Sequence, residues 1–216
     1  MTQLTVAAVA ANFGRDLKDA FARIEILLDD ARARGASLVV LPEATLGGYL
    51  TNLSGAGAVS LSVDLGGGWR PGYTGRQWDS TTHRSSTQLQ QLTGLVARNA
   101  PAAAKDVSMA GVVGTLGMLA ESSGCGAVLD VAAVPRPDGV SAGDWLTCFP
   151  GFAMVTTDRP GRPITDRGAA TTAACGELTT GAGVALRWPD GELTEAITAG
   201  VTGLGAASPQ REEQSQ

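Results

Sequence analysis

The stretch KDVSMAGVVGTLGMLAESSGCGAVLDVAAVPRP, from Lys105 to Pro137, decides the fold of the larger part of this chain. Its first half, Lys105–Glu121, is rich in small residues and predicts a helix that packs closely against a sheet. The apolar run Ala127–Ala132 then predicts a strand. Pro135–Gly143 reads as a loop, after which Asp144 is placed to begin a short helix.

The segments around this stretch predict a glycine-rich α+β region. Val59–Leu65 alternates as a strand does, and Ser85–Arg98 has the apolar spacing of a helix that begins at its paired serines. Between them lies a turn-rich loop. Three further strands are predicted, at Gly151–Thr156, Val184–Trp188 and Ala196–Val201. The polar end of the chain, residues 208–216, predicts a disordered tail.

The beginning of the chain has a different character. Leu4–Ala11 is apolar and predicts a strand, Asp16 can cap a helix that ends before Gly35, and Leu38–Leu41 is a continuous apolar run. Strand, helix and strand in this order predict one βαβ unit with a parallel sheet. The continuous run predicts that the second strand is buried on both faces.

Composition excludes several functional classes. The net charge is −5, with only two lysines, Lys18 and Lys105, and one histidine, His83. Nucleic-acid binding would need clustered basic residues, so no nucleic-acid partner is expected. The sequence shows neither a signal peptide nor an apolar run long enough for a membrane helix, and we expect a cytoplasmic protein without a membrane partner.

The three cysteines, Cys125, Cys148 and Cys175, are widely spaced and odd in number. A disulfide framework and a zinc site both need paired residues at suitable spacing, so we expect free thiols in a reducing compartment and no metal site.

Glu43 follows the second strand directly, in SLVVLPEATLGGY (Ser37–Tyr49). Active-site residues of open α/β sheets lie at the carboxyl ends of strands, so Glu43 is a candidate general base. Residues 2–53 resemble the start of the carbon–nitrogen hydrolase (nitrilase) superfamily. That resemblance implies a general-base role for Glu43, and it also requires a lysine and a nucleophilic cysteine on later strands. Neither Lys105 nor Cys175 lies in the sequence context that the family needs.

The remainder, residues 59–205, resembles the C-terminal domain of AIR synthase-related (PurM-like) proteins. That superfamily includes aminoimidazole ribonucleotide synthase, selenophosphate synthetase, thiamine-monophosphate kinase and a hydrogenase maturation protein. Asp106, Ser108 and Gly111 match the family pattern Asp-x-Ser/Thr-x-x-Gly at the start of a helix. Family members bind ATP and magnesium mainly through an N-terminal domain with acidic metal ligands, and here little of that domain is visible.

Two interpretations of this helix start remain open. Asp106 or Ser108 can cap the helix, and the exposed N–H groups beside Lys105 and Gly111 would form a phosphate site. The alternative is that Gly111 and the later glycines serve only close helix–sheet packing. Among the remaining polar groups, Asp64 and Asp79 are expected as turn or cap residues and His83 as an exposed loop histidine.

The sequence thus predicts a composite α/β and α+β chain. A nitrilase-like βαβ fragment (residues 1–53) joins an AIR synthase-like region (residues 58–207) near Ser54. The expected function is a module for ATP or another phosphate ligand, with Mg-ATP as the candidate cofactor and an incomplete active site. The alternative is a carbon–nitrogen hydrolase that uses Glu43. Expected partners are a small molecule and either a second copy or a related subunit that pairs with exposed strand edges.

Overall fold

The computed structural model describes residues 4–11, 13, 17–42, 50–51, 57–159, 161–165 and 168–202. The chain forms two compact units, residues 1–50 and 51–216, which are described separately. Glu43, Asp16 and the predicted tail at 208–216 lie outside the described residues.

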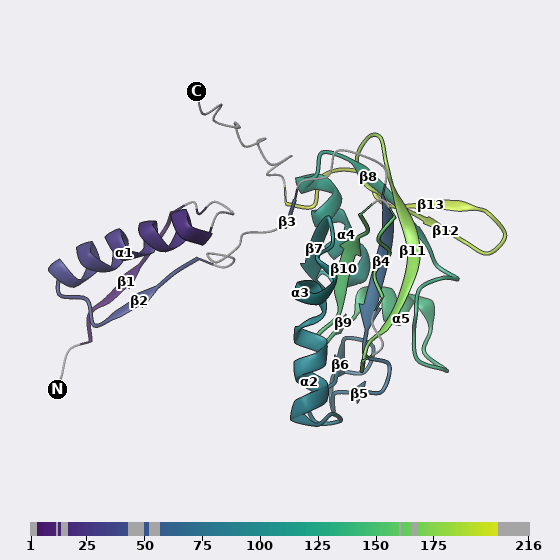
Figure 1. Ribbon diagram of the computed structural model, residues 1–216. Coiled ribbons are helices and arrows are strands. Elements are labelled where there is room, and N and C mark those ends of the chain that lie inside the picture. Colours follow the sequence, from purple (N-terminus) through teal and green to yellow (C-terminus); the bar gives the residue numbers. More distant parts are fainter. Residues whose placement is uncertain are drawn as a thin grey trace. The chain divides into compact units, whose positions relative to one another are not determined.

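The first unit is a βαβ element (Figure 1). Strands β1 (Val6–Ala8) and β2 (Leu38–Val40) pair in parallel, with Val6 opposite Leu38, and α1 (Leu17–Ala33) connects them. Gly35 follows the helix with φ +80, the left-handed conformation expected at that position, so the predicted helix end is confirmed.

The predicted burial of the second strand is wrong. Leu38 and Val40 are about half exposed, at 49% and 51%. In a two-stranded sheet with one helix, alternate side chains face away from that helix, so only one face is covered.

The second unit is built on a mixed sheet of eight strands in the order β13-β12-β8-β11-β4-β10-β7-β3. Only β12 and β8 pair in parallel among the ladders described in this sheet; the others are antiparallel. The strands are β3 (Leu50–Thr51), β4 (Ala58–Val63), β7 (Ala103–Asp106), β8 (Gly126–Asp130), β10 (Met154–Thr157), β11 (Thr171–Thr179), β12 (Val184–Arg187) and β13 (Leu193–Ile197).

A small three-stranded sheet lies beside it, formed by β5 (Gly68–Trp69), β6 (Gln77–Asp79) and β9 (Phe149–Pro150). Trp69, Trp78 and Trp145 pack edge to face here, with ring centroids 5.2–6.4 Å apart. Such contacts add to the apolar burial of these large rings.

Helices cover both faces of the large sheet. Leu92 of α2 (Ser86–Thr93) and Leu95 of α3 (Leu95–Asn99) form a buried cluster against which Met154 of β10 packs. Successive strand side chains alternate, so the neighbouring Val155 faces the opposite side, where α4 (Gly111–Ser122) packs on β7, β8 and β10. The short helix α5 (Ala142–Thr147) contacts α4.

Several predictions of local structure are confirmed. Ser85 caps α2, with its side chain and that of Gln88 forming a capping box. The strands expected at 59–65 and 127–132 are β4 and β8. The short helix expected near Asp144 is α5, although Ser141 is its N-cap and Asp144 lies in its first turn.

Three further expectations of local structure are wrong. The strand expected at Ala196–Val201 lies earlier, at Leu193–Ile197 (β13). The helix expected from Lys105 begins only at Gly111, because Ala103–Asp106 pairs with β10 as strand β7. Thr171–Thr179 was not expected to be a strand, yet it is the nine-residue β11 and pairs with both β4 and β8.

Candidate functional site

The candidate site lies where β7 ends and α4 begins. Lys105 is paired with Val155, and Asp106 with Met154, in the antiparallel ladder between β7 and β10. The Val107 N–H continues this ladder by donating to the Ala153 carbonyl at 2.9 Å. The backbone of the strand end is therefore fixed before the chain turns into the helix.

The last two residues of β7 are a cation, Lys105, and an acid, Asp106. The Lys105 side chain is 14% exposed and that of Asp106 is 56% exposed, and Nζ lies 3.5 Å from Oδ1. The Lys105 side chain as a whole is therefore largely covered, whereas the Asp106 side chain is open to solvent.

Gly111 is required by the turn into α4. Its φ is +68, and a Cβ built there would lie 2.8 Å from the Leu146 carbonyl oxygen and 2.9 Å from the Thr147 backbone. The Gly111 N–H is already used, since it donates to the Ser108 carbonyl at 2.9 Å. The structure thus gives Gly111 the packing role, against α5, that was one of the two interpretations.

The predicted side-chain cap of α4 is wrong. The N-cap residue is Ala110, whose side chain makes no capping hydrogen bond. Asp106 and Ser108 lie too far before the helix to cap it. Strand β7 ends at Asp106, and residues 107–110 form the connection to the helix start at Gly111. A helix start without an N-cap side chain is a position that suits an anion.

Asp64 forms a structural ion pair with Arg84. Its side chain is fully buried, and Arg84 bridges both carboxylate oxygens, with Nη2 2.6 Å from Oδ1. Burial opposes ionisation of Asp64, but hydrogen bonds from Arg84 and the Gly66 N–H outweigh it and lower the pKa of Asp64 below its usual value. The pair anchors the chain after β4 to the segment before α2.

Asp79 and His83 have the roles expected of them. Asp79 accepts hydrogen bonds from the Thr81 N–H at 2.8 Å and the Thr82 hydroxyl at 2.5 Å, and these lower its pKa. It is therefore a turn residue. His83 is exposed.

Asp158 is a buried acid that the sequence did not single out. It follows β10 and accepts a hydrogen bond from the Ser60 hydroxyl at 3.1 Å. Burial raises its pKa above the usual value. The polar Thr157–Gly168 context gave no sign that this carboxylate would lie against a central strand.

The cysteine thiols are poorly suited to nucleophilic catalysis. Burial raises the pKa of both Cys148 and Cys175 to about 12, and it also raises the pKa of Cys125. The thiolate is the nucleophilic form of cysteine, and at neutral pH almost none would be present. All three thiols are free, as expected.

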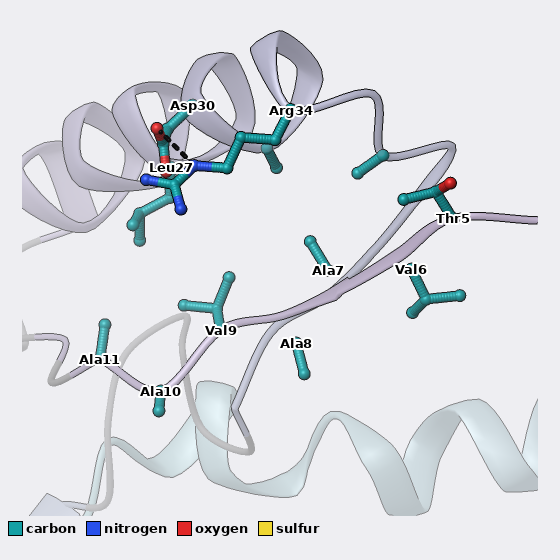
Figure 2. A pocket seen from close by; sticks show the side chains of 12 residues that line it. Thr5, Val6, Ala7, Ala8, Val9, Ala10, Ala11, Leu27, Asp30 and Arg34 are labelled. Carbon is teal, nitrogen blue, oxygen red and sulfur yellow. Dashed lines mark hydrogen bonds and ion pairs between the residues drawn. The ribbon is translucent and has the colours of Figure 1, made fainter.

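A pocket of about 410 Å³ belongs to the first unit and runs along β1 (Figure 2). Ala7 and Val9 point toward α1, whereas Val6 and Ala8 point away from it. Asp30 and Arg34 of α1 form an exposed ion pair at its edge. Its lining is otherwise formed mostly by small apolar side chains and offers no acid–base pair.

The described part of the chain holds neither a metal-binding cluster nor a membrane-spanning helix. There, no three His, Cys, Asp or Glu side chains are grouped so that they could hold a metal ion. No helix within the described ranges is long and apolar enough to cross a membrane.

The family of the chain follows from comparison with known proteins. Residues 33–165 match the family of the AIR synthase related protein C-terminal domain, and because this is more than half of the chain, the chain belongs to that family. The match includes β7, α4 and the predicted site residues Lys105, Asp106, Ser108 and Gly111.

Two curated relatives, both uncharacterised, align with parts of the chain. A protein from Synechocystis sp. is 39% identical over 87 residues, which are 38% of this chain and 27% of that protein. A protein from Methanocaldococcus jannaschii is 36% identical over 84 residues, 37% of this chain and 26% of that protein. The chain thus matches about a quarter of each relative's length.

The fold resembles PurL of Thermotoga maritima, in a structure solved in complex with ATP. The TM-score is 0.53 at 13% identity, covering 94% of this chain and 38% of PurL. At this identity the likeness shows a common fold. These comparisons support the AIR synthase-related resemblance, whereas the carbon–nitrogen hydrolase resemblance of residues 1–53 has no support from them and stays a prediction.

Proposed function

We propose that the second unit is a binding module for a phosphate-bearing small molecule, with its site at the β7–α4 junction and Mg-ATP as the ligand to test. The observation that carries the proposal is the position of Lys105, whose side chain is 14% exposed, at the end of β7 and next to a helix start without a side-chain cap. Family membership and the ATP complex of PurL support this choice of ligand.

Each residue has a defined role in the proposal. The Lys105 ammonium would pair with a phosphate oxygen, and the first-turn N–H groups of α4 would donate to the same group. Asp106, open to solvent, is the residue that would hold a hydrated Mg²⁺, because magnesium usually binds through one or two carboxylates together with substrate phosphates. Gly111 would contribute only through its packing against α5, which fixes the start of α4.

The proposal concerns binding and makes no claim of turnover. The family match covers a C-terminal domain, and the chain covers 38% of PurL, so catalytic groups of a whole protein would come from elsewhere. A second copy or a related subunit could supply them. We do not propose carbon–nitrogen hydrolysis, because burial raises the pKa of all three thiols.

The test is isothermal titration calorimetry of the full chain with Mg-ATP and with magnesium tripolyphosphate. Lys105→Ala should weaken the binding of both ligands at least about tenfold, the loss expected for a charge-assisted hydrogen bond. Lys18→Ala is the matched control, because Lys18 is the other lysine of the chain and lies exposed in α1. Absence of binding by the native chain, or equal affinity of the two lysine variants, would refute the proposal.

A further inference from the structure

One edge of β1 carries backbone groups that no described strand pairs with. The Thr5 carbonyl accepts a hydrogen bond from the first N–H of β2 at 3.3 Å, and the Val9 N–H donates to the last carbonyl of β2 at 2.9 Å. Backbone direction alternates along a strand, so the N–H and C=O groups of Val6, Ala8 and Ala10 point to the other edge. Within the described residues, the sheet of the first unit ends there.

The pocket of the first unit lies along this open edge (Figure 2). Its described lining comes from Thr5–Ala11 of the β1 segment and from α1, but not from β2. Leu27, Ala31 and Arg34 of α1 are spaced as one face of a helix. The groove thus joins an unpaired strand edge to a helix face, the surroundings that a further strand of an α/β sheet would have.

The edge of β1 has none of the usual protection against pairing. Residues 4–11 contain no charge and no proline, the devices that commonly protect sheet edges. Asp30 and Arg34 at the groove pair with each other at 3.0 Å, so the groove carries no net charge. By contrast β13, which ends the large sheet, carries Glu195 at its centre.

We propose that β1 pairs with β1 of a second copy of this chain, antiparallel about a twofold axis at Ala8. The two first units then form one four-stranded sheet in the order β2-β1-β1-β2. This inference goes beyond the proposed function and does not depend on the phosphate site.

The open edge is complementary to itself. With the axis at Ala8, the Ala8 N–H and C=O bond those of the partner's Ala8, and the groups of Val6 bond those of the partner's Ala10. All of these side chains are small and uncharged, so no like charges face each other.

The helices also fit this arrangement. Each α1 lies over its own pair of strands, so the axis places the two helices two strand spacings apart, about 9–10 Å. That is the usual separation of packed helices. A second copy therefore fills the groove with a strand and sets its helix beside α1 without a gap.

The test is sedimentation velocity of the full chain and its variants. The native chain should form a dimer, and Ala8→Pro and Ala8→Lys should each raise the dimer Kd at least about tenfold. Proline removes the two hydrogen bonds donated at the axis, and lysine brings two like charges together there. Leu38→Lys is the matched control, because Leu38 is 49% exposed on β2, and this variant should dimerise as the native chain does.

Folding does not confuse this test. The Ala8 N–H points away from β2 and Ala8 is exposed, so neither variant removes a contact within the first unit, as circular dichroism would verify. A monomeric native chain, or Ala8 variants that dimerise normally, would overturn the proposal. A dimer lost in Leu38→Lys but kept in the Ala8 variants would show that the sheets stack by their faces, and would also overturn it.

Cross-linking tests the register. In a hydrogen-bonded antiparallel pair the Cα atoms lie about 5.5 Å apart, within the range of a disulfide, so Ala8→Cys should give a covalent dimer on mild oxidation. Leu38→Cys should not, because the two β2 strands lie three strand spacings apart, about 14 Å. The native chain, with its three free thiols, is the background control. Equal cross-linking of the two cysteine variants would contradict the axis at Ala8.

Discussion

Gly111→Ala should strongly destabilise the second unit. The substitution places a Cβ at φ +68, which costs an L-residue about 1–2 kcal/mol. That Cβ would also lie 2.8 Å from the Leu146 carbonyl oxygen and 2.9 Å from the Thr147 backbone, so α4 and α5 must move apart. Overpacking of this kind costs about 1–3 kcal/mol.

The two contributions give an expected loss of about 2–5 kcal/mol in the free energy of unfolding. Urea denaturation followed by circular dichroism measures it, and for a domain of this size the melting temperature should fall by about 4–20 °C. Gly143→Ala is the matched control: it lies in α5 with no atom within 4 Å of the added Cβ, and alanine there should stabilise by about 0.5–1 kcal/mol. A Gly111→Ala variant within about 0.5 kcal/mol of the native chain would refute the packing argument.

Three other predictions concern buried groups. Arg84→Ala leaves Asp64 buried without its partner and should cost about 3 kcal/mol in urea denaturation, whereas the Arg84→Met/Asp64→Leu double variant should cost less; equal losses would contradict the ion-pair account. Because the pKa of Asp64 is lowered on folding, its stabilisation is present above its ordinary value of 3.8 and is lost as the pH falls through the lowered pKa, so the native chain should lose more stability between about pH 4 and 2 than Asp64→Asn. Cys148 and Cys175 should resist iodoacetamide at pH 8 until urea unfolds the chain, as read by mass spectrometry; rapid labelling of either in the folded chain would show that its thiol is neither buried nor held protonated.

The features predicted well from sequence are those with local signals. Gly35 marks a helix end and Ser85 a helix start, because capping depends on residues within one turn. The apolar alternation of β4 likewise depends only on neighbouring residues.

The features that were missed depend on residues far apart in the chain. Lys105 lies in a strand because β10, about fifty residues later, pairs with it, and β11 is a strand because β4 and β8 flank it. Thr171–Thr179 has too many polar and small residues to predict a central strand by pattern. Asp64 could not be assigned to a buried ion pair, because its partner Arg84 follows a turn-rich loop.

The candidate site was predicted in part. The sequence placed Lys105, Asp106, Ser108 and Gly111 together at a helix start, and the structure brings them to one junction. It could not distinguish the packing role of Gly111 from a ligand role, since that depends on the backbone of α5.

The most direct test of the central claim is an NMR titration of the ¹⁵N-labelled chain with Mg-ATP. The account predicts that the amide signals of Lys105, Asp106 and the first turn of α4 shift progressively and saturate, while those of α1 do not move. Shifts confined to other elements, or no shifts at millimolar ligand, would contradict a phosphate-ligand site at the β7–α4 junction.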